Sequence, residues 1–236
     1  MNNVIKEANE LFKTAGFDYN ICGGFAFDIH AQKELRTHGD LDIAVFEENK
    51  IEAVKFLFDN GWSIFGRFME DNKMATQMLF YKVDNPDDEQ WITCKNFWAI
   101  KPTAYLEMYE LTRHAGTYSY KLSENTQNTY VQNFDFIEIE VDSRKNDEYI
   151  VRNEKFISRK MEKAILYKEG IPYLAPEIIL FLKADRKSMQ SPSTRGKTKA
   201  DFEAIVPILA DEQKSWLKDS LSTAYPDGYA WLEGLV

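Results

Sequence analysis

Two carboxylates lie one residue apart in the segment Asp40-Leu41-Asp42, and they are the side chains of this chain best suited to hold a cation. The apolar residues that follow, Ile43 to Phe46, are typical of a strand that enters a core. Residues i and i+2 of a strand point to the same face, so we expect Asp40 and Asp42 to lie side by side. Two such carboxylates repel each other unless a proton or a cation lies between them. Since Mg²⁺ prefers carboxylates, waters and phosphates as ligands, the spacing predicts a Mg²⁺ site that faces a phosphate.

A glycine pair, Gly23-Gly24, precedes these carboxylates by a short span. It follows the apolar residues Ile21 and Cys22 and leads into apolar residues at helical spacing, so we expect it where a strand turns into a helix. Glycine allows a ligand to approach the main chain closely, and the free N–H groups that begin a helix favour an anion. The pair therefore predicts a second, phosphate-binding part of the same site.

Acidic and apolar residues alternate in the stretch Phe134–Val141, which predicts a strand with Glu138 and Glu140 on one face. A carboxylate on a strand beside Asp40 and Asp42 could complete a metal site or take a proton as general base. The alternative is that both glutamates mark the solvated face of a half-buried sheet. The residues alone leave these two interpretations open.

Two basic residues, Arg36 and His38, lie between the glycine pair and the first aspartate. An arginine fork can grip phosphate oxygens at two points, and a histidine can donate to them. We expect both to contact phosphate, with an exposed loop cation and a turn-orienting histidine as the alternatives.

These residues together resemble a known signature. A Gly-Gly pair followed by an acidic–apolar–acidic strand resembles the nucleotidyltransferase superfamily. The longer pattern, Gly-Gly-Phe-Ala-Phe-Asp and then Arg-x-His-x-Asp-x-Asp-Ile-Ala-Val-Phe, is similar to the branch of aminoglycoside 2″-adenylyltransferases and lincosamide nucleotidyltransferases. Members of that branch often carry Trp where Phe25 stands. The resemblance covers about residues 18–48, with a weaker similarity from Gly170 to Leu235.

The resemblance implies a Mg²⁺-dependent enzyme that moves a nucleoside monophosphate, AMP from ATP, to a hydroxyl of a small acceptor such as an aminoglycoside- or lincosamide-like antibiotic. Pyrophosphate is released. By the family pattern Glu138 is preferred to Glu140 as the third carboxylate. The implied catalytic and metal-binding residues are Asp40, Asp42 and Glu138. The implied nucleotide-binding residues are Gly23, Gly24, Arg36, His38 and Lys183.

Two other functions remain open at this stage. A toxin-type nucleotidyltransferase would modify a protein or tRNA and would label a macromolecule. A nucleotide-binding protein without catalysis would need no usable carboxylate at Glu138 or Glu140, and the intact Asp40-Leu41-Asp42 segment argues against it.

The composition limits the range of partners. The chain has 236 residues, 29 basic against 38 acidic, and its net charge of −9 argues against broad binding to nucleic acid but suits a cationic small substrate. Cys22 and Cys94 form no metal or disulfide motif, and no apolar run reaches the length of a membrane span. We expect a cytoplasmic protein, a monomer or a homodimer, with no membrane partner.

The spacing of apolar residues along the sequence predicts the elements that position these residues. It indicates an α/β (α+β) chain in which a small mixed sheet with flanking helices is followed by a helical part. We expect a catalytic domain over residues 1–153 and a helical C-terminal part over 154–236, with strands giving way to helices after about residue 153. Helices are expected before Gly16, before Asn60-Gly61 and after Pro176. A polar loop is expected over Ser188–Thr198.

Overall fold

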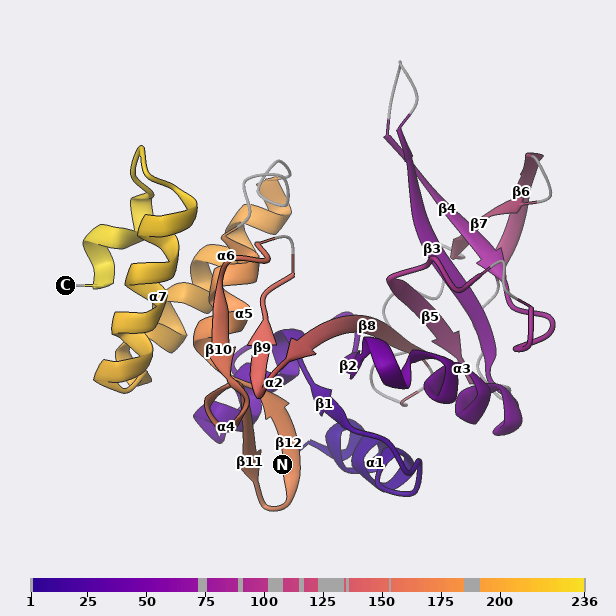
Figure 1. The fold of residues 1–236 in the computed structure, drawn as a ribbon, viewed down its shortest axis with the longest axis horizontal. Coiled ribbons are helices and arrows are strands. Elements are labelled where there is room, and N and C mark those ends of the chain that lie inside the picture. Colours follow the sequence, from indigo (N-terminus) through magenta and orange to yellow (C-terminus); the bar gives the residue numbers. More distant parts are fainter. Residues whose placement is uncertain are drawn as a thin grey trace. The chain divides into compact units, whose positions relative to one another are not determined.

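The chain forms two compact units in a computed structural model that describes residues 2–71, 76–88, 91–101, 108–114, 117–122, 134, 136–152, 154–184 and 192–235 (Figure 1). The first, called the sheet unit, comprises Asn2–Tyr19 and His38–Val141. The second, called the helical unit, comprises Asn20–Thr37 and Asp142–Val236. The domain division expected at residue 153 stays a prediction.

The sheet unit contains most of the strands. Its helices and strands are α1 (Asn3–Phe12), β2 (Asp42–Phe46), η1 (Glu47–Asn49), α3 (Lys50–Asp59), β3 (Ser63–Asp71), β4 (Thr76–Lys82), β5 (Asn96–Ile100), β6 (Met108–His114), β7 (Thr117–Leu122) and β8 (Phe136–Lys145), whose last residues enter the helical unit. Their order across the sheet is β2-β8-β5-β3-β4-β7-β6. The strands β8, β5, β3 and β4 pair antiparallel in succession.

The register across three of these strands aligns polar side chains. Glu140 on β8 pairs with Asn96 on β5, and Asn96 pairs with Arg67 on β3. Glu138, two residues before Glu140, pairs with Trp98. Since directly paired residues project to the same side of a sheet, Arg67 comes from two strands away onto the face that carries both glutamates.

The helices expected in the sheet unit are confirmed. The apolar face of α1 is buried through Val4, Ile5, Ala8 and Phe12, and its first turn is capped by the Asn2 side chain at 2.9 Å from the Val4 backbone nitrogen. Helix α3 ends at Asp59, and Gly61 follows with φ +80°, a conformation that glycine adopts without strain.

The helical unit combines short strands with helices. Its elements are β1 (Tyr19–Ile21), α2 (Gly23–Ala31), β9 (Glu148–Ile150), β10 (Ser158–Lys160), α4 (Met161–Ala164), β11 (Ile165–Lys168), β12 (Ile171–Leu174), α5 (Pro176–Lys183), α6 (Pro192–Ile205), η6 (Val206–Ile208), α7 (Asp211–Ala224) and η7 (Ala230–Leu235). Strands β1 and β12 pair in parallel and β11 and β12 antiparallel, which makes the sheet mixed and confirms the expected α+β class.

Two local expectations were wrong in this unit. Strands do not end near residue 153, because Ile165–Lys168 and Ile171–Leu174 form a hairpin around Glu169-Gly170, both at positive φ. Of the polar loop expected over Ser188–Thr198, residues 192–198 belong to α6, and residues 188–191 lie outside the described residues. Proline is well tolerated in the first turn of a helix, where its missing N–H has no intrahelical partner in any case.

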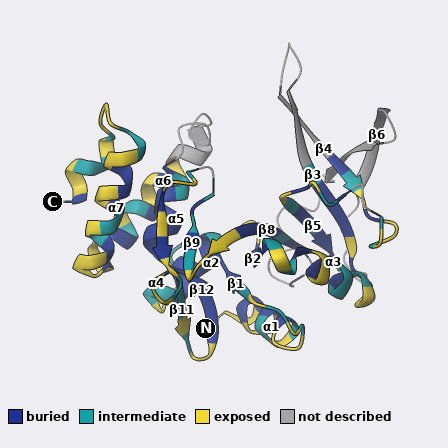
Figure 2. Cartoon of the chain, viewed as in Figure 1, coloured by how far each residue is buried: buried dark blue, intermediate teal, exposed yellow. Residues whose placement is uncertain are grey.

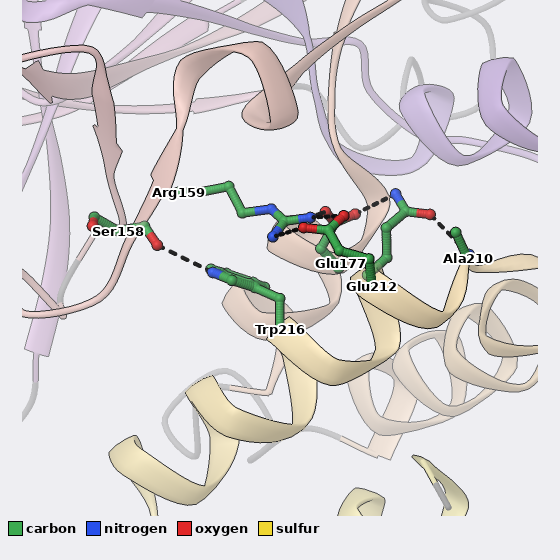
Figure 3. A network of polar contacts seen from close by, with 7 residues as sticks. Ser158, Arg159, Glu177, Ala210, Glu212 and Trp216 are labelled. Carbon is green, nitrogen blue, oxygen red and sulfur yellow. Dashed lines mark hydrogen bonds and ion pairs between the residues drawn. The ribbon is translucent and has the colours of Figure 1, made fainter.

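A polar network with the buried pair Arg159–Glu177 at its centre joins three elements of the helical unit (Figure 3). Arg159 of β10 donates to Glu177 at 2.7 Å and to Glu212 of α7 at 2.8 Å, and the Trp216 indole donates to the Ser158 carbonyl at 3.1 Å. Glu177 is fully buried in the first turn of α5, and burial raises the pKa of its carboxyl although Arg159 lowers it. The network therefore ties the C-terminal helices to a strand through a charge pair that water does not reach.

The core of each unit follows particular elements (Figure 2). Buried side chains line β2, β5 and β8 in the sheet unit and β12 and α5 in the helical unit. Among the described residues, no helix combines the length and apolar character needed to cross a membrane.

Candidate functional site

The two predicted aspartates and the third carboxylate lie together in the sheet unit. The backbone nitrogen of Glu138 donates to the Leu41 carbonyl at 2.9 Å, so β8 runs beside the Asp40-Leu41-Asp42 segment. One carboxylate oxygen from each of Asp40, Asp42 and Glu138 lies within 4.8 Å of the others. We call these three residues the acidic cluster.

The acidic cluster has the composition that a hard divalent cation requires. All three donors are carboxylate oxygens, the ligand type that Mg²⁺ prefers. Asp40 is exposed, whereas Asp42 and Glu138 are half-buried. A cation held here would therefore be fixed from the protein side by Asp42 and Glu138, with one side open to waters or a substrate.

One arginine contacts the acidic cluster, and sequence reasoning did not find it. The Arg67 guanidinium lies 2.5 Å from a Glu138 oxygen and 3.9 Å from a Glu140 oxygen. Asn96 donates a hydrogen bond to Glu140 from the strand between them. Glu138 is thus the glutamate that reaches the aspartates, whereas Glu140 is held by Asn96 and lies near Arg67.

The Glu138 carboxyl has an unusual proton affinity. Its pKa is raised to about 7: burial is the largest influence, the nearby charges of Glu140 and Asp40 act in the same direction, and Arg67 acts in the opposite direction. A carboxyl with such a pKa exchanges its proton near neutral pH. It therefore has the property expected of a general base.

The glycine pair lies where the sequence predicted it, between strand β1 and helix α2 of the helical unit. Gly23 begins the helix at φ +60°, which disfavours any residue with a Cβ. Cys22 precedes the helix and offers no side-chain hydrogen bond to its first turn. The backbone there keeps the features of an anion-binding helix start.

Two of the predicted phosphate-binding residues share one carboxylate in the helical unit. Arg36 donates to both oxygens of Asp201 on α6, from Nε at 2.8 Å and from Nη2 at 3.2 Å. The Lys183 ammonium, at the end of α5, lies 3.2 Å from an Asp201 oxygen. We call Arg36, Lys183 and Asp201 the basic cluster, because two cations surround a single carboxylate.

The sequence predicts His38 as a site residue but not Arg67 or Asp201. His38 is buried in the sheet unit, with 8% of its surface exposed. Arg67 and Asp201 were missed because an alternating strand and an amphipathic helix explain them without any site. The signal in hindsight is local: Arg67 stands in the apolar run Ile64–Met69, and Asp201 lies directly between Ala200 and Phe202.

Residues 4–76 match the model of the aminoglycoside-2″-adenylyltransferase family. The matched segment contains the glycine pair and both aspartates. The match confirms the predicted resemblance to this nucleotidyltransferase branch and supports the predicted enzyme class. No curated protein sequence matches the chain.

Solved structures with a similar course of the chain were also found. A structure of ANT(2″)-Ia in complex with adenylyl-2″-tobramycin is 12% identical, with a TM-score of 0.48, over 94% of this chain and 99% of that one. The lincosamide antibiotic adenylyltransferase LnuA, bound to lincomycin, is 12% identical, with a TM-score of 0.45, over 85% and 96%. A nucleotidyltransferase-like protein from Paracoccidioides brasiliensis is 15% identical, with a TM-score of 0.42, over 99% and 90%.

Proposed function

We propose that this nucleotidyltransferase is Mg²⁺-dependent and transfers AMP from ATP to a hydroxyl of a small acceptor, with release of pyrophosphate. The observation that carries the proposal is the acidic cluster, in which Asp40, Asp42 and Glu138 bring one oxygen each within 4.8 Å. Two of its members belong to the segment that matches an adenylyltransferase family. The third, Glu138, comes from β8, about one hundred residues further along the sequence, so the tertiary fold brings the three carboxylates together.

The acidic cluster would hold the cation. Mg²⁺ bound to Asp40, Asp42 and Glu138 would neutralise phosphate charge and lower the pKa of a coordinated hydroxyl. Arg67 supports this arrangement, because its guanidinium contacts Glu138 and limits the repulsion among the carboxylates.

Glu138 would also serve as the group that accepts the proton of the attacking hydroxyl. Its carboxylate lies with those of Asp40 and Asp42, where a hydroxyl coordinated to the cation would meet an oxygen able to take its proton. The acceptor hydroxyl would then attack the α-phosphorus, and the bond to pyrophosphate would break.

The phosphate-binding roles fall on the residues that the sequence singled out. Gly23 and Gly24 would offer backbone N–H groups at the start of α2. Arg36 and Lys183 would contribute positive charge from the basic cluster, and His38 would donate a hydrogen bond near the metal ligands.

The proposed acceptor is the substrate class of the matched family, an aminoglycoside. An aminoglycoside carries amino groups that are protonated at neutral pH, and a chain with a net charge of −9 attracts such a cation. A lincosamide-like acceptor belongs to the same branch of the resemblance. The proposal includes a cytoplasmic location and a monomer or homodimer.

The test is transfer of label from ATP carrying radioactive α-phosphate, with Mg²⁺ and a panel of aminoglycosides and lincosamides. A labelled small product that is lost on chelation of Mg²⁺ is the expected result. Label on a protein or tRNA instead would replace the small acceptor with a macromolecule. ATP binding without any labelled product would contradict the transfer reaction itself.

A further inference from the structure

The side chain directly opposite Glu138 in the sheet is an indole. Trp98 of β5 pairs with Glu138 of β8, whereas the next pair along, Phe97 and Ile139, projects to the other face. Both pairs belong to the sheet unit. Side chains paired in this way have their Cβ atoms about 4.5–5.5 Å apart, so the Trp98 ring begins beside a carboxyl of the acidic cluster.

The Trp98 ring is packed between two other aromatic rings. Its centroid lies 4.4 Å from that of Phe80 on β4 and 5.4 Å from that of Phe136, two residues before Glu138 on β8. Phe80 and Phe136 are both buried. Rings packed at these separations restrict one another's rotation, so the direction of the Trp98 indole N–H is fixed by side chains from two other strands.

The polar atom of this ring interacts with Glu138. Within the described part of the chain, the buried Nε1 of Trp98 has no hydrogen bond of regular geometry. It nevertheless acts on the Glu138 carboxyl as a hydrogen-bond donor does and lowers the pKa of that group, against the larger effect of burial. A buried N–H without a partner is costly, and hydrogen bonds to a carboxylate are stronger than those to a neutral acceptor. Glu138 is therefore the acceptor toward which the indole contributes.

Trp98 differs in charge from Arg67, the other side chain that contacts Glu138. The Arg67 guanidinium is cationic, so it and a divalent cation compete for the same carboxyl. The indole is a neutral donor and adds no positive charge to a site that binds a cation. A neutral donor can therefore hold Glu138 both before and after a cation binds.

We propose that Trp98 is a positioning residue for Glu138: its indole N–H holds the carboxyl in the orientation in which it joins Asp40 and Asp42. Hydrogen-bond partners of metal ligands contribute about 10- to 100-fold to metal affinity or activity, because they fix the direction of the ligand. This role rests on the proposed function, since it takes Glu138 as a ligand of Mg²⁺. Trp98 acts through Glu138 and needs no contact of its own with metal or substrate.

The first test is the affinity of the full chain for Mg²⁺ alone, measured by titration calorimetry. In Trp98→Phe, which keeps an aromatic ring and removes the N–H, we expect the Kd for Mg²⁺ to rise about tenfold. Trp91→Phe is the matched control, because Trp91 is buried in the same unit and packs on Phe97, on the opposite face of β5. It should bind Mg²⁺ as the wild type does. Equal weakening in both variants would reduce the effect to lost packing and overturn the positioning role.

A double-mutant cycle shows whether the effect passes through Glu138. Glu138→Gln alone should weaken Mg²⁺ binding, and in its background Trp98→Phe should change the Kd for Mg²⁺ less than about twofold. Additive effects of the two substitutions would overturn the proposal, because Trp98 would then act without Glu138. If Trp98→Phe does not fold, 3-benzothienylalanine at position 98 takes its place, since sulfur replaces the N–H and the two fused rings keep their shape.

The rate of label transfer separates a failure of this role from a failure of the proposed function. Unchanged Mg²⁺ affinity in Trp98→Phe, with labelled product formed by the wild type, would overturn the positioning role and leave the transfer reaction standing. Weaker Mg²⁺ binding in Trp98→Phe than in Trp91→Phe, with no transfer by the wild type, would support the positioning of Glu138 and overturn the transfer reaction.

Discussion

The acidic cluster of the sheet unit and the basic cluster of the helical unit are electrostatic opposites. In the first, Arg67 contacts Glu138, one of three carboxylates, and lies near Glu140. In the second, two cations contact one carboxylate, Asp201. We call Arg67 and Asp201 the minority charges, because each contacts residues of the opposite sign, which we call the majority charges.

In both clusters, like charges lie close together in the absence of a ligand because a residue of opposite charge contacts them. A single opposite charge reduces the repulsion but does not cancel the charge of the cluster. The acidic cluster offers carboxylate oxygens, which suit a hard cation, and the basic cluster offers guanidinium and ammonium groups, which suit an anion.

The largest expected effect is a fall in the rate of adenylyl transfer when Asp42, a carboxylate of the acidic cluster, is neutralised. Asp42→Asn removes one of three carboxylates and should lower the rate of adenylyl transfer on the order of 10³-fold, because several kcal/mol of charge stabilisation depend on the metal. The measurement is the initial rate of label transfer at saturating ATP and Mg²⁺. Asp59→Asn, at the exposed end of α3 in the same unit, is the control and should keep the wild-type rate. A rate for Asp42→Asn within tenfold of wild type would contradict a metal role for the acidic cluster.

A smaller effect should separate the two glutamates of β8. Glu138→Gln should lower the transfer rate about 10²-fold, since it removes both a metal ligand and the base. Glu140→Gln should change the rate less than about fivefold, because this side chain is bonded to Asn96 and lies outside the group of three. The two variants are matched in chemistry and in strand. A reversed order would assign the third carboxylate to Glu140.

The minority charges are where the sequence was least informative. Asp40, Asp42 and the glycine pair form a motif within about two dozen residues, so their order and spacing predict the strand and helix that carry them. Glu138 could be proposed from alternation, because Glu138 and Glu140 are half-buried on β8 while Ile137, Ile139 and Val141 between and beside them are buried. Local periodicity thus identifies the residues that line an element.

Arg67 and Asp201 could not be found in this way. Arg67 on β3 contacts Glu138 on β8 across the single strand β5 that lies between them. The order of strands in a sheet is not encoded in the period of any one strand. Asp201 meets Arg36 across 165 positions, on a helix whose start the polar composition concealed. Long-range pairing of charges depends on the tertiary fold, which the local pattern of a single element does not contain.

Asp201→Asn removes the carboxylate of the basic cluster and should lower the free energy of unfolding by an amount that depends on pH. Burial raises the pKa of Asp201, but hydrogen bonds from Arg36 and the charge of Lys183 lower it more, so the folded-state pKa lies below its ordinary value. A carboxyl with a lowered pKa stabilises the fold above the unfolded-state pKa of about 3.9, and this stability is lost as pH falls through the folded-state pKa. Asp201→Asn should therefore cost about 1–2 kcal/mol at pH 7 and progressively less below about pH 4.

Urea unfolding of both proteins between pH 7 and pH 3 measures this difference. Glu203→Gln is the control, because an exposed helix pair contributes little at any pH. The same loss of stability at pH 3 as at pH 7 would show that the shape of Asp201 matters and its charge does not.

The smallest effect concerns the minority charge of the acidic cluster. Arg67→Met leaves the carboxylates without their guanidinium, so the variant should unfold at a lower temperature in the absence of Mg²⁺. A more negative cluster binds Mg²⁺ more tightly, and a ligand that binds only the folded state stabilises it by RT ln(1 + [L]/Kd), which grows as Kd falls. The rise in Tm on addition of Mg²⁺ should therefore exceed that of the wild type, by about 1–3 °C. Lys55→Met, which breaks an exposed ion pair with Asp87, should show the wild-type rise. An equal rise for Arg67→Met would mean that Arg67 does not offset the charge that binds the cation, and the symmetry between the two clusters would not hold.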